Sequence, residues 1–270
     1  MLEFEFMQRT LIVGCMLAIA LPLLGIVMIN RKTSMVSDAL SHISLTGVGL
    51  GLIFGFDPVI GAVISCVVGA LYIERIREKM PQFGDMAVAV TLSAGLGLAV
   101  ILADLAPGGN TFESYLFGSI SSVTASDVMS CAVIFLLVVG ISIFLYADLQ
   151  DAAINATLAR LAGVKVRVVN TIFTVLSALL IGLACKVVGA LLVVSIVTLP
   201  VACALIISRS YIQTCLISVA VGLTATLSGL SFSYYVDVRP GGSIVVACVI
   251  LILAFLGLEK LLRRRRCRQL

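Results

Sequence analysis

Apolar runs of about 20 residues recur along the whole length of this 270-residue chain, with short polar breaks between them. A helix rises about 1.5 Å per residue, so one such run crosses the roughly 30 Å hydrocarbon core of a bilayer. The runs lie near residues 10–29, 36–56, 58–74, 86–104, 128–146, 169–185, 187–207, 211–231 and 242–258. With 61% hydrophobic and 12% charged residues, the chain is too apolar for a water-soluble surface. We expect an all-α, polytopic transmembrane bundle of eight to nine helices, forming a single domain over residues 1–270.

One charge decides the number of crossings, and the other basic residues indicate the orientation. Lys186, with Gly189 close behind, interrupts an otherwise continuous apolar stretch, so one or two helices lie there. Lys and Arg favour the cytoplasmic side of a membrane. If the chain crosses nine times, one side collects 15 of the 18 basic residues, including Arg263–Arg266, and the other keeps Arg9, Lys186 and Arg239. The C-terminus is therefore expected in the cytoplasm and the N-terminus outside.

Several function classes lack their sequence requirements. The net charge of +4 arises from the arginine-rich tail, which suits anchoring at anionic lipid and gives no reason to expect nucleic-acid binding. No Gly-x-x-x-x-Gly-Lys-Ser/Thr loop is present to hold ATP phosphates. A single histidine makes most hydrolytic triads hard to assemble. We therefore expect no enzyme activity, and ATP-driven work would need a second polypeptide.

The cysteines do not form a recognisable metal or disulfide pattern. There are eight, and no two lie closer than 12 residues apart, so a Cys-x-x-Cys site and a compact disulfide framework are both excluded. Most are expected to be small, buried, apolar side chains.

The candidate site is formed by Asp38 and by His42, the only histidine of the chain. If residues 36–56 are helical, a spacing of four places the carboxylate and the imidazole on one face, one turn apart. Ionisable groups in a membrane segment tend to face a pathway or a partner, and both groups are good ligands for a divalent transition metal. One chain offers two of four ligands, and two copies about a two-fold axis would complete a tetrahedral set. The alternative is that His42 is an interhelical hydrogen-bonding residue and Asp38 caps the helix start.

Small residues recur at every fourth position in the second and third runs, at Gly47, Gly51 and Gly55 and at Gly61, Ser65 and Gly69. Such spacing lets helix backbones approach closely inside a bilayer, so both helices are expected in the interior of the bundle. The remaining carboxylates considered are expected to be solvated loop charges: Asp57, Glu74, Glu78, Asp85, Asp104, Glu113 and Asp237.

The segment Arg31-Lys-Thr-Ser-Met-Val-Ser-Asp-Ala-Leu-Ser-His resembles an Arg-Arg-Met-Ser-x-x-Gly-Asp-x-Leu-x-His signature, with Lys32 for the second arginine and Ser37 for the glycine. That signature is found in the integral membrane permease of zinc and manganese ABC importers. Further segments that resemble this family follow in the same order, at residues 114–120, 159–163, 188–204 and 233–245. The resemblance covers nearly the full chain.

The resemblance implies a type II ABC importer-like fold and a homodimeric channel in a bacterial cytoplasmic membrane. It also implies that an extracytoplasmic metal-binding lipoprotein delivers the ion, that two cytoplasmic ATPase subunits drive import, and that Asp38 and His42 line the metal path. No cofactor is bound permanently, because the metal is the transported ion. Two loops on the basic side, Leu149–Arg167 and Ser208–Gln213, are candidates for the ATPase contact through short helices.

Zinc is expected over manganese. A nitrogen ligand favours zinc by intrinsic affinity. The stretches 6–11, 105–109 and 114–119 also look more like the zinc branch of the family. A different class stays open from the residues alone, namely an ATP-independent metal channel or secondary carrier, which would transport without an ATPase.

Overall fold

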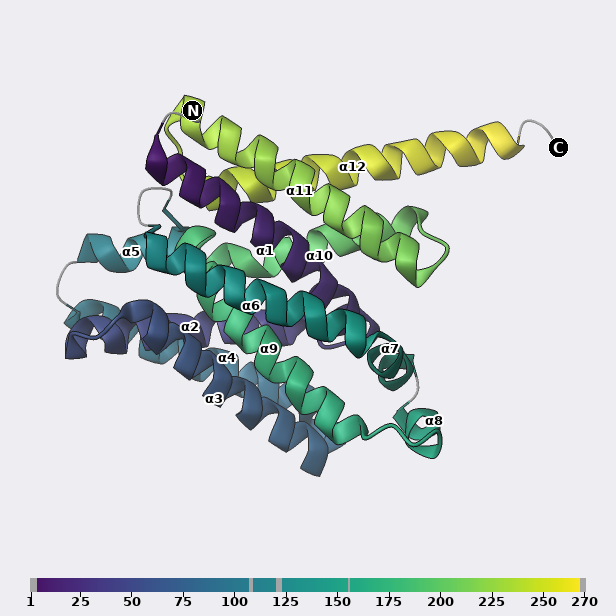
Figure 1. Cartoon of the computed structure of the whole chain (residues 1–270), viewed down its shortest axis with the longest axis horizontal. Helices are drawn as coiled ribbons and strands as arrows, with labels where there is room; N and C mark the ends of the chain where they lie inside the picture. Colours follow the sequence, from purple (N-terminus) through teal and green to yellow (C-terminus); the bar gives the residue numbers. More distant parts are fainter. Residues whose placement is uncertain (1–3, 107–108, 120–122, 155, 268–270) are drawn as a thin grey trace.

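The computed structural model describes residues 4–106, 109–119, 123–154 and 156–267, with side chains described over these residues apart from 81, 109–111, 146, 147, 154, 156 and 258–267 (Figure 1). Every regular element in this part of the chain is a helix. Nine of these helices are long and apolar enough to cross a membrane: α1 (Glu5–Asn30), α2 (Ser34–Phe54), α3 (Pro58–Lys79), α4 (Gly84–Leu105), α6 (Ala125–Phe144), α9 (Val166–Val187), α10 (Ala190–Ile207), α11 (Tyr211–Val236) and α12 (Pro240–Cys267). The expected all-α transmembrane bundle is confirmed.

The stretch around Lys186 contains two helices. Lys186 lies in the last turn of α9, and α10 begins only three residues after α9 ends. Gly189 separates them with φ at 95°, a left-handed conformation that favours glycine. The higher of the two expected helix counts is therefore the one observed in the described residues.

Three shorter helices and one 3-10 turn connect the long ones. The turn η1 (Pro81–Phe83) lies between α3 and α4, and α5 (Gly109–Phe117) lies between α4 and α6. The helices α7 (Tyr146–Ile154) and α8 (Ala156–Leu161) lie in or next to Leu149–Arg167, one of the two loops in which short helices were expected. The other candidate loop has none of its own, because α11 begins at Tyr211, directly after the 208–210 connection. The hydropathy pattern missed α5, which is too short to register as an apolar run.

Local sequence signals explain several helix ends. Asp57 caps α3 by accepting a hydrogen bond from the Val59 N–H, and Pro58 occupies the first turn, where its missing N–H costs nothing. Thr124 and Asp127 form a capping box at the start of α6. The turn after α1 is a Schellman motif in which the Thr33 N–H bonds to the Met28 carbonyl.

The helix α2 lies at the centre of one half of the bundle, in contact with α3, α4, α9 and α10. On the other side, α1 and α10 separate α2 from the pair α11 and α12 (Figure 1). The most buried of the long helices are α1, α2 and α9, whereas α4, α6 and α12 leave broad apolar faces exposed. Exposed apolar surface of this extent is what lipid-facing helices require.

Close packing of α2 on α3 follows the small residues. A Cβ added at Gly47 would lie 2.1 Å from the Gly61 carbonyl oxygen, and one at Gly51 would lie 2.7 Å from Pro58 Cα. The backbones therefore touch, as predicted from the spacing. Gly55 plays another role, because it ends α2 in the left-handed conformation with φ at 75°. The expectation that α3 is an interior helix is only half right, since its other face is exposed along Ile60, Ile64 and Val68.

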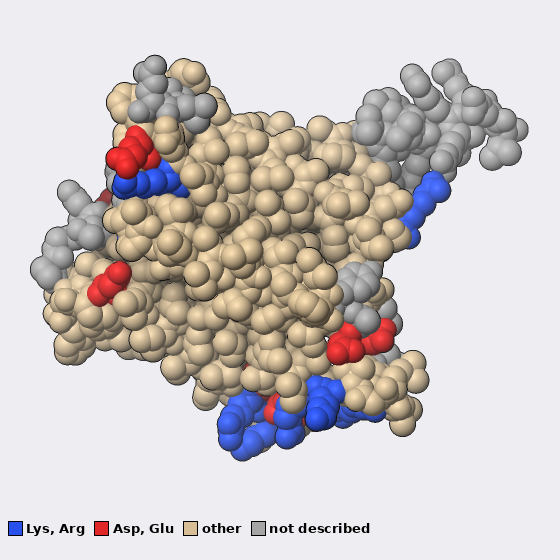
Figure 2. All heavy atoms as spheres, viewed as in Figure 1, with Lys and Arg blue, Asp and Glu red and all other residues tan. Residues whose placement is uncertain are grey.

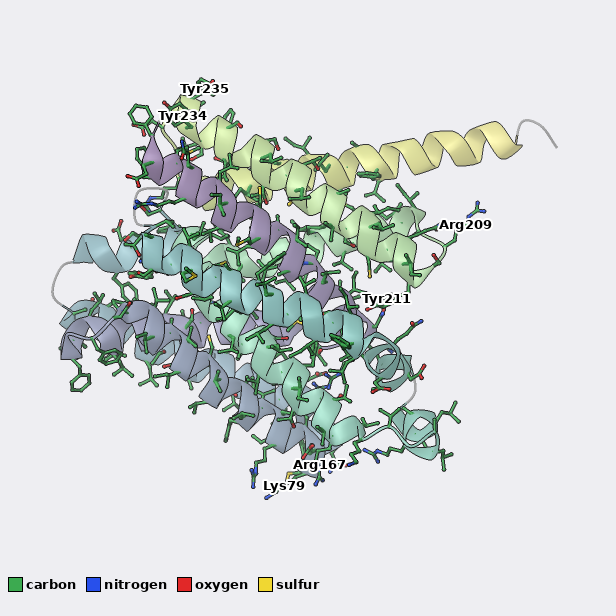
Figure 3. All side chains as sticks on the ribbon, viewed as in Figure 1. Lys79, Arg167, Arg209, Tyr211, Tyr234 and Tyr235 are labelled. Carbon is green, nitrogen blue, oxygen red and sulfur yellow. The ribbon has the colours of Figure 1, made fainter. Side chains whose placement is uncertain are left out.

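The two ends of the bundle differ in charge. We call the end with Arg31, Lys79, Arg167 and Arg209 the α8 end, and the opposite end with Glu113, Lys186 and Arg239 the α5 end. Figure 2 shows Lys and Arg gathered along the lower edge of the molecule, where Figure 3 labels Lys79 and Arg167. This distribution follows the grouping of basic residues expected from alternate connections. The side chains of Arg263–Arg266 lie outside the described part.

Candidate functional site

Asp38 and His42 lie one turn apart on the same face of α2, as their spacing predicts. His42 Nε2 is 3.7 Å from Asp38 Oδ1, too far for a good hydrogen bond. The distance is close to that between two donor atoms on one ion, because metal–ligand bonds of about 2.0–2.2 Å at a tetrahedral angle separate the donors by about 3.3–3.6 Å. A small displacement of either side chain would let the pair chelate a divalent cation.

His42 contains an unsatisfied polar atom. Its side chain is only 13% exposed, and among the described residues its Nδ1 is buried without a hydrogen-bond partner. Buried polar atoms are nearly always paired, so an orphaned ring nitrogen has a free-energy cost that needs an explanation. The interhelical hydrogen-bonding role considered for His42 finds no partner for this atom. A capping role for Asp38 is also not observed, because α2 begins at Ser34 and its first turn holds no acidic residue.

The pair lies on the side of α2 that its own chain leaves partly uncovered. Residues at helical spacing along this side are exposed or half-buried: Met35, Asp38, His42, Thr46 and Leu50. The helix α4 borders it closely, because a Cβ added at Gly95 would lie 2.9 Å from Ile43 and 3.3 Å from the His42 carbonyl carbon. Thr46 Oγ1 donates to the Gly95 carbonyl at 2.9 Å, which fixes the two helices at this level. The partly uncovered stripe therefore leaves the Asp38 side chain 33% exposed and the His42 side chain 13% exposed.

One protomer does not complete a metal site. In the part of the chain that the structure describes, no three His, Cys, Asp or Glu side chains lie close enough together to hold an ion. Zinc in proteins usually has four ligands, or three and a water. Two donors per chain therefore suffice only if a second copy, or water, supplies the rest.

A group of buried charges at the α8 end fixes the start of α2. Glu74 of α3 lies 3.5 Å from Arg31 Nη2 and 3.8 Å from Arg77 Nη1, and Thr174 of α9 donates to it at 3.5 Å. Arg31 precedes α2 by three residues and also lies over the Phe173 ring at 5.5 Å. Burial lowers the pKa of Arg31, and the attraction of Glu74 opposes this shift. The turn that starts α2 is thereby tied to both α3 and α9.

The expectation that Glu74 is a solvated loop charge is wrong. Its side chain is 10% exposed, because α9 packs across the end of α3 and covers it. Sequence reasoning had no signal for this, since the partner Thr174 lies 100 residues away. Of the other carboxylates, Asp57, Asp85, Asp104 and Asp237 are exposed as expected, and Glu78 pairs with Arg167 at 3.1 Å.

The α5 end has two ion pairs that the sequence did not indicate. Lys186 Nζ lies 2.6 Å from Asp127 Oδ2 with both side chains 13% exposed, which joins the end of α9 to the start of α6. Arg239 Nη2 lies 2.9 Å from Glu113 Oε2, and its guanidinium stacks 4.5 Å from the Phe117 ring centroid. Capping-box spacing indicates the role of Asp127 at the helix start, but nothing local indicates its lysine partner.

The cysteines agree with a packing role. Every cysteine of the described side chains is free, and Cys66, Cys131, Cys185, Cys203 and Cys248 are buried. Cys66 donates to the Leu40 carbonyl at 3.2 Å, so it packs directly behind the candidate site on α2. The Cys267 side chain lies outside the described part.

Comparisons with known proteins agree with this arrangement. Residues 3–258 match the ABC 3 transport family. The manganese import system permease protein ScaB of Streptococcus gordonii is 31% identical over 93% of this chain and 90% of its own length. A probable metal transport system membrane protein of Treponema pallidum is 29% identical over 98% of this chain and 100% of its own. The solved structure of PsaBC from Streptococcus pneumoniae in complex with Fab superposes with a TM-score of 0.84 at 28% identity, covering 93% of this chain and 91% of that one.

The names of the relatives extend beyond one metal, since they include manganese transport and probable iron transport. They share the description of membrane protein or permease of a transport system. The family match spans nearly all nine long helices, so the likeness concerns the whole transmembrane bundle. The chain belongs to the ABC 3 transport family and is the permease of a metal-ion ABC importer.

Proposed function

We propose that this permease moves a divalent transition metal into the cytoplasm through a transient site formed by Asp38 and His42. The observation that carries the proposal is the pair of donor atoms 3.7 Å apart on the partly uncovered side of a central membrane helix. The second nitrogen of a metal-bound imidazole normally has a hydrogen-bond partner, whereas His42 Nδ1 has none among the described residues, so the proposal requires that it gain one. We infer that this partner is supplied in another conformation or by a second copy.

The proposed site is shared by two protomers. One chain provides one carboxylate and one imidazole, and a two-fold axis beside the uncovered stripe of α2 would bring two of each together. Four such donors match the ligand number of a tetrahedral ion.

Either zinc or manganese suits this donor set, and the names of the relatives do not favour zinc. Imidazole ligands favour zinc by affinity, whereas carboxylates suit manganese, and cells select by geometry and availability. The relatives described above that are named for a single metal are named for manganese or iron. Uptake of radioactive zinc and manganese, each competed by the other, would decide between them, because the true substrate blocks uptake of the other ion at the lower concentration.

We propose that the α8 end faces the cytoplasm and binds two ATPase subunits, while the α5 end receives the ion from an extracytoplasmic lipoprotein. The basic residues at the α8 end support this orientation in a bacterial cytoplasmic membrane. The short helices α7 and α8 make the loop within 149–167 the better candidate for the ATPase contact, because the 208–210 connection offers no comparable element. Family membership favours this ATP-driven system over a secondary carrier.

The test replaces the two proposed ligands and measures metal uptake by cells. Asp38→Ala and His42→Ala should each lower uptake by about 100-fold or more. Mutating a residue that only hydrogen-bonds to a metal ligand already costs about 10- to 100-fold, and these two residues are the proposed ligands themselves. Asp85→Ala is the matched control, because it removes an exposed carboxylate at the start of α4 and should retain uptake. Size-exclusion chromatography of each purified variant shows that the protein still assembles. Normal uptake by both ligand variants would contradict the proposal.

A further inference from the structure

A groove of about 830 Å³ lies between α11 and α12, away from the candidate metal site. It begins beside Arg239 at the α5 end and runs along α12 as far as Leu251. Both helices are long and apolar enough to span a bilayer, so the groove opens toward the hydrocarbon. Its floor is lined by small residues, among them Gly229, Gly242 and Ala247.

The lining leaves little polar chemistry inside the groove. Its three hydroxyl side chains bond to carbonyls of their own helices: Thr224 donates to Val221 at 3.0 Å, Ser228 to Thr224 at 2.7 Å and Ser243 to Arg239 at 3.3 Å. Phe232, Val246 and Ile250 form exposed apolar walls. An occupant of the groove must therefore be apolar along its length.

The groove has the length of one lipid leaflet. From Arg239 to Leu251 the chain advances about 18 Å at 1.5 Å per residue. Half of a hydrocarbon core of roughly 30 Å is about 15 Å. An acyl chain that enters at the membrane surface would therefore run from Arg239 to the bilayer centre.

Arg239 provides a positive charge where a lipid headgroup would lie. Its side chain is 53% exposed, and within the described part of the chain its guanidinium pairs with Glu113 through Nη2 alone. Arginine has five N–H donors, so others stay available to a phosphate. The Phe117 ring under the guanidinium holds it at this level.

A second copy of the chain is a poorer occupant. The proposed dimer axis lies beside α2, and α1 and α10 stand between α2 and the groove (Figure 1). We propose that the α11–α12 groove binds one phospholipid of the leaflet at the α5 end, with an acyl chain along α12 and the phosphate at Arg239.

The absence of tryptophan from the chain allows a clean test. Phe232→Trp places one fluorophore in the groove, and Met129→Trp places one on an exposed face of α6 at a similar distance from the α5 end. Each protein is reconstituted with phosphatidylcholine or phosphatidylglycerol brominated on the acyl chains. Quenching of the Phe232→Trp protein should show a preference for the anionic lipid of about fivefold, the effect of one basic residue near a membrane surface. The Met129→Trp protein should show none.

Two further variants assign the headgroup contact. Arg239→Gln in the Phe232→Trp background should abolish the preference, and Glu113→Gln should raise it by freeing the guanidinium. Ala247→Phe fills the groove floor and should reduce quenching by either lipid. Equal quenching of the two fluorophores without headgroup preference would overturn the proposal. So would a Phe232→Trp fluorophore shielded from both lipids, the result expected if a second copy covered the groove.

Discussion

At the scale of single residues, Glu74 has the greatest consequence for stability. It is the one carboxylate within reach of Arg31 and Arg77 among the described side chains, and both it and Arg31 are 10% exposed. Removing one partner of a buried ion pair leaves the other charge without compensation in a low-dielectric region. Removing Glu74 therefore leaves the buried Arg31, at the turn that starts α2, without a charged partner.

Glu74→Ala should lower the free energy of unfolding by about 3 kcal/mol, at the low end for buried pairs because the contacts are long. Glu78→Ala is the matched control one turn later, since its partner Arg167 is 79% exposed and such pairs contribute at most about 1 kcal/mol. Unfolding in mixed micelles by increasing denaturing detergent measures both. Equal losses for the two variants would show that burial of Glu74 contributes nothing.

The shared face of Asp38 and His42 was predictable from the sequence, whereas the burial of Glu74 was not, for a physical reason. A spacing of four within one helix is a local property, so the shared face of the pair follows from the helix alone. The burial of Glu74 depends on which distant helix covers it, and α9 is more than 80 residues further along the chain. The orphaned Nδ1 of His42 likewise depends on the neighbours of the ring, which the sequence does not specify.

At the scale of elements, three glycines join the α5 end. A Cβ at Gly189 would lie 2.3 Å from the Phe117 carbonyl carbon, one at Gly118 would lie 2.6 Å from the Val187 carbonyl oxygen, and one at Gly241 would lie 2.0 Å from the Val188 carbonyl oxygen. The end of α5, the turn between α9 and α10 and the start of α12 therefore meet backbone to backbone. Such contacts have no flexible side chain that can move aside.

Gly189→Ala should destabilise the protein by at least about 1–2 kcal/mol, because the substitution meets both a left-handed φ and a steric overlap. Gly140→Ala should have the opposite sign and stabilise the protein by about 0.5–1 kcal/mol, because alanine is the better residue inside a helix. Gly140 lies within α6, and nothing lies within 4 Å of a Cβ added there. Thermal melting of the purified proteins in detergent measures both signs. A neutral Gly189→Ala would contradict the tight junction.

The helix break at Lys186 was predictable from the sequence, but the contact that stabilises it was not. One charge and one glycine indicated a break, but not the ion pair with Asp127 that holds the break in place. The helix α5 was missed because nine residues carry too little apolar character for a membrane run.

At the scale of the whole molecule, the α8 end presents an exposed apolar surface outside the long helices. Leu158 and Leu161, one turn apart on α8, are 62% and 81% exposed. Exposed leucines on a short helix beside basic residues suit a protein partner better than water.

The nine membrane spans were predictable because hydropathy adds up over each apolar run. Which spans pack against each other was not predictable, because the apolar runs resemble one another.

Leu161→Asp should abolish copurification of the proposed ATPase subunit with the permease, because a charge would be buried at the contact. Ile212→Asp, an exposed apolar residue after the 208–210 connection, is the matched control and should retain the ATPase. Affinity purification of the coexpressed subunits measures the ratio of the two chains. Loss of the ATPase with Ile212→Asp alone would assign the main contact to the other loop.

The backbone contact between Gly47 and Gly61 has a mechanical consequence. No side chain separates the two backbones at this contact, so a tilt or slide of α2 past α3 must first pull their main chains apart there. We therefore expect α2 and α3 to move together. If an ion passes His42 as proposed, we expect the movement that admits it to take place between α2 and its neighbours other than α3, such as α4 or α10.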